Sequence, residues 1–352
     1  MKNSRKILII IITLAIIIST LSGSVSKMVT INASVITKTP VKVAVIVYDA
    51  DLYISEIIKN LKDIQKENEG NVEFTFFPCN KDQAIQNQIL NTTLGSKEFD
   101  LFLVALVDEI NSAQEVIDKI KQNNMPVIIF HREPYGKQKN AIKSYGRAIF
   151  IGTDPAEGGV LQGELLIDLW NKNKHNIDKN EDNIMQYIML KGRSVDLHEI
   201  ERTKHSILTV NDAGIKTQEL SSQFANWDEE QAKNIMESLF LRYGEKIEVI
   251  IANNDAMAIG AIKALQAHGY NTGDTQRTIT VIGVDGVPEA IELIKKGAMA
   301  GTVLQDAKGV AEALYTCGMN LVEYKNPIEG TKYKFDDTGV SIRIPYQQYK
   351  PS

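Results

Sequence analysis

The sequence predicts an α/β protein built from parallel sheets, and three observations support this prediction. Short apolar runs alternate with segments of helical periodicity from residue 41 onward, polar side chains follow the apolar runs, and 352 residues are enough for two domains. The runs that we expect to be strands are 43–47, 74–77, 101–104, 127–130, 149–151, 184–190, 247–252, 280–284 and 302–304.

Helices are expected between these strands. One apolar face recurs at helical spacing in Ile54, Ile57, Ile58, Leu61 and Ile64. A second helix begins at residues 154–157, where the sequence DPAE supplies an N-cap, a proline in the first turn and a capping glutamate. The alternation of strands and helices indicates βαβ units.

The stretch 250–265 shows how one strand is followed by a helix. A β-branched apolar run leads into Asn253, Asn254 and Asp255, and apolar residues at helical spacing then continue to Leu265, ahead of Gly269. The polar triplet is therefore expected at the carboxyl edge of a sheet, where α/β proteins bind ligands.

The N-terminus has the features of an export signal. A cationic tip precedes an apolar run at residues 7–21, which predicts a protein that works outside the cytoplasm. Residues 21–24, LSGS, resemble a lipoprotein lipobox in which Ser24 replaces the lipidated cysteine, so we expect no lipid there. The run is either cleaved or kept as a membrane anchor, and residues 23–40 are expected to form a linker.

Charge and cysteine content exclude several classes of function. The first 40 residues carry five cations and no acid, which leaves 34 Lys and Arg against 44 Asp and Glu in the body, a poor match for nucleic acid. Cys79 and Cys317 are interpreted as buried thiols rather than a disulfide, and two cysteines cannot hold zinc unaided.

Polar side chains collect after the predicted strands. The groups are Tyr48, Asp49, Asp51 and Tyr53, then Asp108, then His131, Arg132 and Glu133, then residues 191–202, 253–255, Asp285, and finally Gln305 and Asp306. Carboxylates, amides, an arginine and aromatic rings suit a ligand with many hydroxyl groups, because each hydroxyl both donates and accepts. Helix capping is the alternative role for any single Asp or Asn. It does not account for Trp227, Arg202 or the two consecutive asparagines at 253 and 254.

Four strings identify a family resemblance: IANNDAMAIGAIKAL, GVDGVPEAIELIKKGAMAGTVLQDA, IGTDPAEGGVLQGELL and WDEEQAK. Through them, residues 41–346 resemble the galactose/glucose-binding proteins of bacterial ABC sugar uptake, which are type I periplasmic binding proteins. The resemblance implies two Rossmann-like lobes joined by a three-segment hinge that close on one sugar. We expect one lobe at 41–131 and 305–325, the other at 132–304 and 326–352, and the signal or anchor with its linker at 1–40.

The resemblance also implies a sugar site. Aromatic rings cover the faces of the sugar and polar groups bind its rim, at Asp51, Tyr53, Asp196, His198, Arg202, Trp227, Asn254, Asp285 and Gln305. Asp196 and His198 stand in exchanged order relative to the family, Gln305 replaces an asparagine, and Ala105 replaces another. A hexopyranose such as galactose or glucose is favoured, with xylose or a related pentose next.

A calcium site is expected at residues 178–186. Oxygen donors at alternate positions match the first nine places of an EF-hand loop, although its glycine and its final glutamate are missing. The family supplies the missing carboxylate from a distant strand, where this chain has Glu248. A structural Ca²⁺ is thus expected on Asp178, Asn180, Asp182, the Ile184 carbonyl, Gln186 and Glu248, and the alternative is a solvated turn.

The favoured function is a binding protein, monomeric when free, that delivers a monosaccharide to an ABC permease. The first alternative is a membrane-anchored subunit that presents sugar occupancy to a sensor histidine kinase. An enzyme is the second, drawn from Asp196, His198, Glu201 and Arg202 as an acid/base cluster. No G-x-S-x-G motif is present, and Gly158, Gly159 and Gly163 are too loosely spaced for a phosphate loop. The export signal and the lack of a DNA-binding headpiece exclude a repressor.

Overall fold

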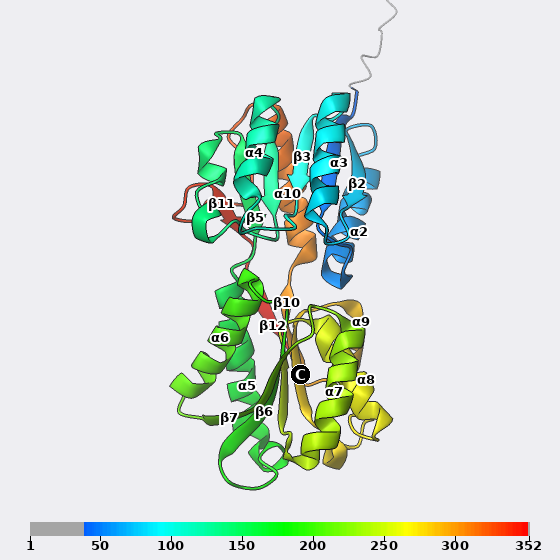
Figure 1. Ribbon diagram of the computed structural model, residues 1–352, viewed down its shortest axis with the longest axis vertical. Helices are drawn as coiled ribbons and strands as arrows, with labels where there is room; N and C mark the ends of the chain where they lie inside the picture. Colours follow the sequence, from blue (N-terminus) through cyan, green and yellow to red (C-terminus); the bar gives the residue numbers. More distant parts are fainter. Residues whose placement is uncertain (1–38, 351–352) are drawn as a thin grey trace, which may run out of the picture. The chain divides into compact units, whose positions relative to one another are not determined.

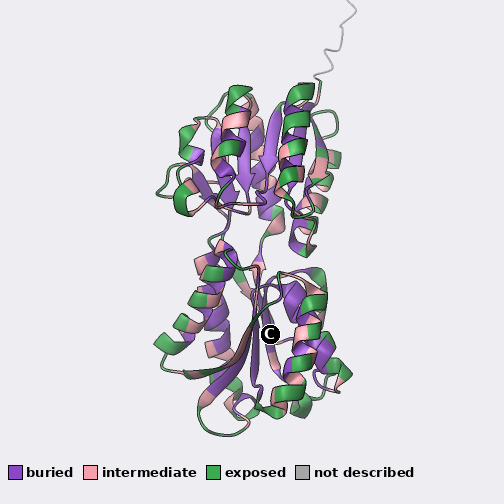
Figure 2. Cartoon of the chain, viewed as in Figure 1, coloured by how far each residue is buried: buried purple, intermediate pink, exposed green. Residues whose placement is uncertain are grey.

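The computed structural model describes residues 39–350, and the expected signal or anchor therefore lies outside the described residues. Two six-stranded sheets organise this part of the chain, each with helices on both faces (Figure 1). The inner strands of each sheet are buried, while the outer faces of most helices are exposed (Figure 2). The α/β prediction is confirmed.

The first sheet has the strand order β11-β5-β4-β3-β1-β2, and all of its pairings are parallel. Helix α2 packs against α10 on one face, and α3 contacts α4 on the other. This sheet with its helices is the first lobe. Its elements are β1 (Val41–Val47), α2 (Leu52–Glu67), β2 (Val72–Pro78), α3 (Gln83–Ser96), β3 (Leu101–Val104), α4 (Ala113–Gln122), β4 (Val127–Phe130), η1 (Gly136–Gln138), η2 (Ile142–Ser144), β5 (Ala148–Gly152), α10 (Ala307–Val322) and β11 (Ser341–Arg343).

The second sheet has the order β12-β10-β9-β8-β6-β7 and is parallel except for β12, which runs antiparallel to β10. Helices α5 and α6 pack together, as do α7 and α8. This is the second lobe. Its elements are α5 (Pro155–Ile177), β6 (Ile184–Lys191), α6 (Leu197–Asp212), β7 (Lys216–Phe224), α7 (Glu229–Tyr243), η3 (Gly244–Lys246), β8 (Val249–Ala252), α8 (Asp255–Ala267), η4 (Thr275–Arg277), β9 (Thr280–Asp285), α9 (Pro288–Lys295), β10 (Gly301–Gln305) and β12 (Tyr346–Tyr349).

The chain passes between the sheets three times, and the expected lobe boundaries need correction. The crossings lie at residues 153–154, at Asp306 and at residues 344–345. The boundaries predicted after residues 131 and 325 are wrong, because β5 pairs with β4, and β11 with β5, in the first sheet. Gln305 ends β10 and so belongs to the second sheet. Hydrophobic periodicity in the sequence indicates that a segment forms a strand, but it does not show which other strand that segment pairs with.

All nine expected strands are present, and three further strands lack a clear sequence signal. The sequence KTQELSSQF forms β7 at an edge of the second sheet, where most of its residues are exposed or partly exposed. An edge strand that is exposed to solvent on both faces does not need the alternation of apolar and polar residues that marks a half-buried strand. The other two, β11 and β12, are only three and four residues long.

Two glycines of α5 bring α6 close enough to position the site. A Cβ on Gly159 would lie 2.9 Å from the Arg202 carbonyl oxygen, and one on Gly163 would lie 2.6 Å from that of Ser206. Real Cβ atoms do not approach so closely, so these residues allow the two helices to meet backbone to backbone. Gly159 and Gly163, which with Gly158 are too loosely spaced for a phosphate loop, therefore serve the packing of α5 against α6.

Cys79 and Cys317 are free and buried, which confirms the interpretation as thiols. Burial raises the pKa of each thiol to about 11. Within residues 39–350, no helix combines the length and apolar character needed to cross a membrane.

We predict that Asp255→Ala destabilises the second lobe by about 3 kcal/mol, since it leaves buried donors without an acceptor. The Asp255 carboxylate accepts from the backbone amides of Gly286 and Val287 at 2.6 and 3.0 Å and from the Thr302 hydroxyl at 2.6 Å. Urea denaturation measures the loss, with the exposed Asp212→Ala as the matched control. Equal stability of the two variants would contradict this role.

Candidate functional site

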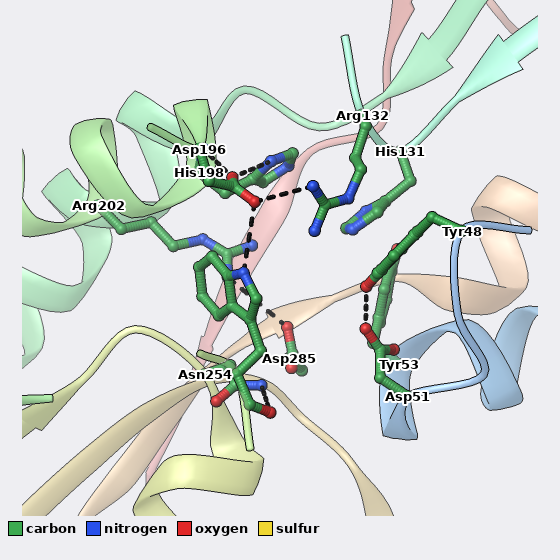
Figure 3. A pocket seen from close by; sticks show the side chains of 11 residues that line it. Tyr48, Asp51, Tyr53, His131, Arg132, Asp196, His198, Arg202, Asn254 and Asp285 are labelled. Atoms are coloured by element: carbon green, nitrogen blue, oxygen red, sulfur yellow. Dashed lines mark hydrogen bonds and ion pairs between the residues drawn. The ribbon is translucent and has the colours of Figure 1, made fainter. Parts of the chain in front are cut away.

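One pocket gathers residues from both lobes at the carboxyl ends of the strands. The space among its lining atoms, counted together with the adjoining open solvent, is about 320 Å³. The lining residues, shown in Figure 3, are Tyr48, Asp51, Tyr53, His131 and Arg132 from the first lobe and Asp196, His198, Arg202, Trp227, Asn254 and Asp285 from the second.

The first-lobe wall is fixed by the start of α2. Asp51 is the N-cap of this helix, and its carboxylate accepts from the Ile54 amide at 2.8 Å and from the Tyr48 hydroxyl. Burial raises the pKa of Asp51, and these hydrogen bonds oppose the rise. Tyr53, the second residue of the helix, is buried and its hydroxyl has no partner.

The second-lobe wall includes an aromatic ring held in an unusual backbone conformation. Trp227 has a φ of 66°, and its indole N–H donates to Asp196 at 3.3 Å. The ring lies directly over Gly192, where a Cβ would fall 2.1 Å from a ring carbon. Asn254, the N-cap of α8, donates to the Trp227 carbonyl at 3.5 Å. The loop after β6 and the start of α8 therefore set the ring position.

Arg202 lies in the centre of the site and is only 2% exposed. Its guanidinium donates to the Asn253 carbonyl at 2.8 Å, to the Gln305 side-chain oxygen at 2.6 Å and to the Tyr346 hydroxyl at 2.8 Å. Asp285 lies 3.8 Å away, where burial raises its pKa and the arginine opposes that rise. The arginine is thus held rigidly with its Nε still unpaired.

Charged contacts join the two lobes beside the pocket. Arg132 pairs with Asp196 at 3.0 Å and with Glu109 of its own lobe at 3.3 Å, and Arg193 reaches Glu109 at 3.3 Å. Burial alone would raise the pKa of Asp196, but Arg132 and the bond to His198 hold it well below its usual range. Asp196 is therefore an ionised acceptor.

A third contact between the lobes involves backbone strain. The Tyr135 hydroxyl donates to the Val195 carbonyl at 3.1 Å. Val195 is exposed and has a φ of 58°, a conformation that is costly for a β-branched residue. The loop that carries Val195 thereby presents its backbone to the first lobe.

Two imidazole rings meet in the pocket. His131 follows β4 and His198 lies in the first turn of α6, and their ring centroids are 4.8 Å apart in a stacked arrangement. Burial lowers the pKa of both rings, and the nearby arginines lower it further, while the hydrogen bond to Asp196 partly opposes the lowering at His198. Both imidazoles are therefore neutral near pH 7.

The pocket has free hydrogen-bonding capacity. Four buried atoms of its lining have no hydrogen-bond partner: the Tyr53 hydroxyl, Nε of Arg132, Nε2 of His198 and Nε of Arg202. Buried polar groups are normally paired, so unpaired ones that line a pocket indicate a polar ligand.

Eight of the nine residues expected to bind sugar line this pocket. The exception, Gln305, lies behind Arg202 and bonds to it. Asp196 and His198, the exchanged pair, are close to each other, with Oδ1 and Nδ1 at 3.7 Å. Tyr48, His131 and Arg132 were not assigned to the sugar site, although their positions directly after strands β1 and β4 could have indicated them.

The expected calcium ligands also lie together, at the opposite end of β6. The Glu248 carboxylate accepts from the Lys179 and Gln186 amides at 2.9 and 3.0 Å, while Asp182 accepts from the Gln186 side chain at 2.8 Å. Burial and the charges of Asp178 and Asp182 raise the pKa of Glu248 to about 7, although these amides oppose the rise.

Two buried oxygens of this loop, Oδ1 of Asp178 and Oε1 of Gln186, have no partner. The missing loop glycine is replaced by Asn183 with a φ of 61°. Across residues 39–350, no three side chains among His, Cys, Asp and Glu form a ready metal cluster, so a cation here needs the amide and carbonyl oxygens as well.

The fold and the pocket described above agree with the family to which similar sequences belong. Residues 41–326 match the family described as periplasmic binding protein domain. The D-galactose/methyl-galactoside binding periplasmic protein of Haemophilus influenzae is 36% identical over 87% of this chain and 88% of its own length. The ribose import binding protein of Escherichia coli is 24% identical over 89% and 96%.

Solved structures share the fold. An ABC transporter solute binding protein from Bacillus halodurans with bound myo-inositol has a TM-score of 0.71 at 24% identity, over 89% of this chain and 95% of its own. One from Actinobacillus succinogenes with bound D-allose has a TM-score of 0.72 at 20% identity, over 88% and 96%. By sequence and by fold, the chain belongs to the periplasmic binding protein family.

Proposed function

We propose that this protein binds one monosaccharide in the pocket between its lobes and delivers it to an ABC permease. The observation that carries the proposal is the composition of the pocket. Aromatic rings come from both lobes, among them Tyr53 and Trp227, and the rim consists of carboxylates, an amide and arginines with unpaired donors. Rings bury the apolar faces of a pyranose, and the rim satisfies its hydroxyls.

Galactose or glucose is the favoured ligand, with a pentose such as xylose next. The relatives named above bind galactose or a methyl galactoside, and ribose, by their names, which supports a compact polyhydroxylated ligand. Gln305 lies behind Arg202 and Ala105 has no polar side chain, so the rim differs from the family pattern at two positions.

A binding role is better supported than catalysis. Asp196 is held ionised by Arg132 and is committed to Trp227, which makes it a poor general acid. Glu201, the other acid proposed for an enzyme, is partly exposed on α6 and pairs with His205 at 3.0 Å instead of lining the pocket. Turnover of oligosaccharides by the purified protein would favour the enzyme.

We further propose a structural Ca²⁺ on Asp178, Asn180, Asp182, the Ile184 carbonyl, Gln186 and Glu248. The unpaired buried oxygens of Asp178 and Gln186 fit a cation, and three carboxylates with amide oxygens suit a hard one. Because this loop lies at the opposite end of β6 from the pocket, the ion would stabilise the second lobe without touching the sugar.

Calorimetry is expected to show micromolar or tighter binding of one sugar from a panel of aldohexoses and aldopentoses. Trp227→Ala should weaken binding by about 2 kcal/mol or more, because it removes a buried aromatic anchor. Tyr324→Ala, an exposed aromatic of the first lobe, is the control. Absence of heat with every sugar would refute the sugar assignment.

Sugar binding is expected to close the two lobes, because ligand contacts come from both. Small-angle scattering should show a smaller radius with sugar. Arg132→Met should enlarge the ligand-free protein, since Asp196 and Glu109 then lose their shared cation and gain hydration when the lobes separate. Lys81→Met, which breaks an exposed pair with Asp49, is the control, and equal radii for both variants would argue against this contact.

Calcium is expected to raise the melting temperature, because it binds only the folded loop. Asp182→Ala should abolish this rise while most of the sugar affinity remains, and Asp212→Ala should retain both. Thermal melts with Ca²⁺ and with EDTA measure the effect. Identical wild-type curves under the two conditions would exclude the site.

The apolar run at residues 7–21 is expected to remain as a membrane anchor facing outward, because no strong cleavage site follows it and residues 23–40 supply a linker. Mass spectrometry of the native protein tests this, and a mature N-terminus between residues 23 and 37 would show cleavage instead. An anchored protein also suits the alternative role of presenting sugar occupancy to a sensor kinase. Co-purification of a kinase without a permease would favour that role.

A further inference from the structure

His131 occupies a strained turn whose effect is to turn its ring into the pocket. Its φ is 62°, and the turn is closed by a hydrogen bond of 2.7 Å from the Arg132 amide to the Phe130 carbonyl. A non-glycine residue in this conformation is destabilised, and such strain concentrates at functional sites. Figure 3 shows the imidazole directed into the pocket beside Tyr48.

Three neighbouring rings hold the imidazole in place. His131 stacks on His198 at 4.8 Å between centroids, and the rings of Tyr53 and Tyr48 lie at 5.4 and 5.8 Å. The pKa of His131 is lowered first by burial and then by His198 and the arginines, so the ring is neutral. A neutral imidazole has one N–H donor and one nitrogen acceptor.

Gln305 determines which nitrogen is the donor. Its side-chain oxygen accepts from Arg202 at 2.6 Å, and since a guanidinium can only donate, this fixes the orientation of the amide. The Gln305 nitrogen therefore faces Nδ1 of His131, at 3.5 Å. Nδ1 must be the acceptor, and the proton lies on Nε2.

Strand β3, which adjoins β4, is followed by no polar group that could replace the His131 imidazole. Ala105 follows β3, which pairs with β4, and its methyl group is fully buried. Beside the unpaired Tyr53 hydroxyl, the turn after β4 therefore supplies a second neutral donor on this wall of the first lobe.

We propose that His131 contacts the ligand and determines specificity: its Nε2–H donates to one hydroxyl of the sugar, and Gln305 is the positioning residue that fixes the tautomer. The inference rests on the proposed function of sugar binding. It predicts that one hydroxyl position of the ligand is recognised through residue 131.

The test is a calorimetric panel of the preferred sugar and its monodeoxy derivatives. His131→Phe keeps a ring for stacking but removes the N–H, and it should bind the parent sugar about tenfold more weakly. One monodeoxy sugar should bind the wild type and this variant equally, because the hydroxyl that pairs with Nε2–H is absent from it. His131→Asn, which restores an amide donor, should recover part of the affinity.

Gln305→Glu tests the positioning role. The glutamate still accepts from Arg202 but turns an acceptor toward His131, which reverses the tautomer. Nε2 then presents a lone pair instead of a proton, so the sugar hydroxyl can pair with it only by donating, and the discrimination against the same monodeoxy sugar should change. His268→Phe, which alters a histidine stacked on Phe240 outside the pocket, is the control. Thermal melts establish that each variant is folded.

The outcomes separate the two proposals. Equal losses for every sugar in His131→Phe, or parent affinity within about twofold of wild type, would overturn the role of His131. Unchanged discrimination in Gln305→Glu would overturn its positioning role. A wild-type protein that binds no sugar would overturn the proposed function itself.

Discussion

The buried guanidinium of Arg202 is the interaction on which the arrangement of the site depends. A buried charge must be hydrogen-bonded, and its partners come from the ends of β8 and β10 and the start of β12. Because Thr153 donates to the Tyr346 hydroxyl at 2.8 Å, residues beside all three crossings between the sheets join one network. A ligand that contacts Arg202 therefore acts on the same hydrogen bonds that connect the lobes.

Burial dominates the electrostatics of the pocket, and pairing decides which groups stay charged. Asp196 has an arginine from the opposite lobe and remains ionised, whereas Asp51 and Asp285 have weaker cationic support and their pKa values rise. Hydroxyl groups suit such a site, because they donate to a carboxylate and accept from an arginine without adding charge. The walls are thus complementary to a neutral polar molecule.

Local pattern predicted most of the fold, whereas the family resemblance predicted most of the site. Apolar runs between helical segments located nine strands. The resemblance placed Asp51, Asp196 and Asn254 in the site, and in the structure each of them also caps a helix that begins at the sheet edge. The lobe boundaries could not be predicted, since sequence pattern does not show that β5 pairs with β4 or that the distant β11 pairs with β5. The position of His131 directly after a strand marks the sheet edge, but the positive φ that turns its ring into the pocket leaves no pattern in the sequence.

The contact between Gly192 and the Trp227 ring constrains how this pocket can evolve. Any side chain at residue 192 would occupy the space of the indole, so it is tolerated only after the ring has become smaller. A smaller ring alone leaves an empty space beside the ligand, which costs affinity until residue 192 fills it. The two positions must therefore change in a fixed order, and specificity can shift along this wall only through a weaker-binding intermediate.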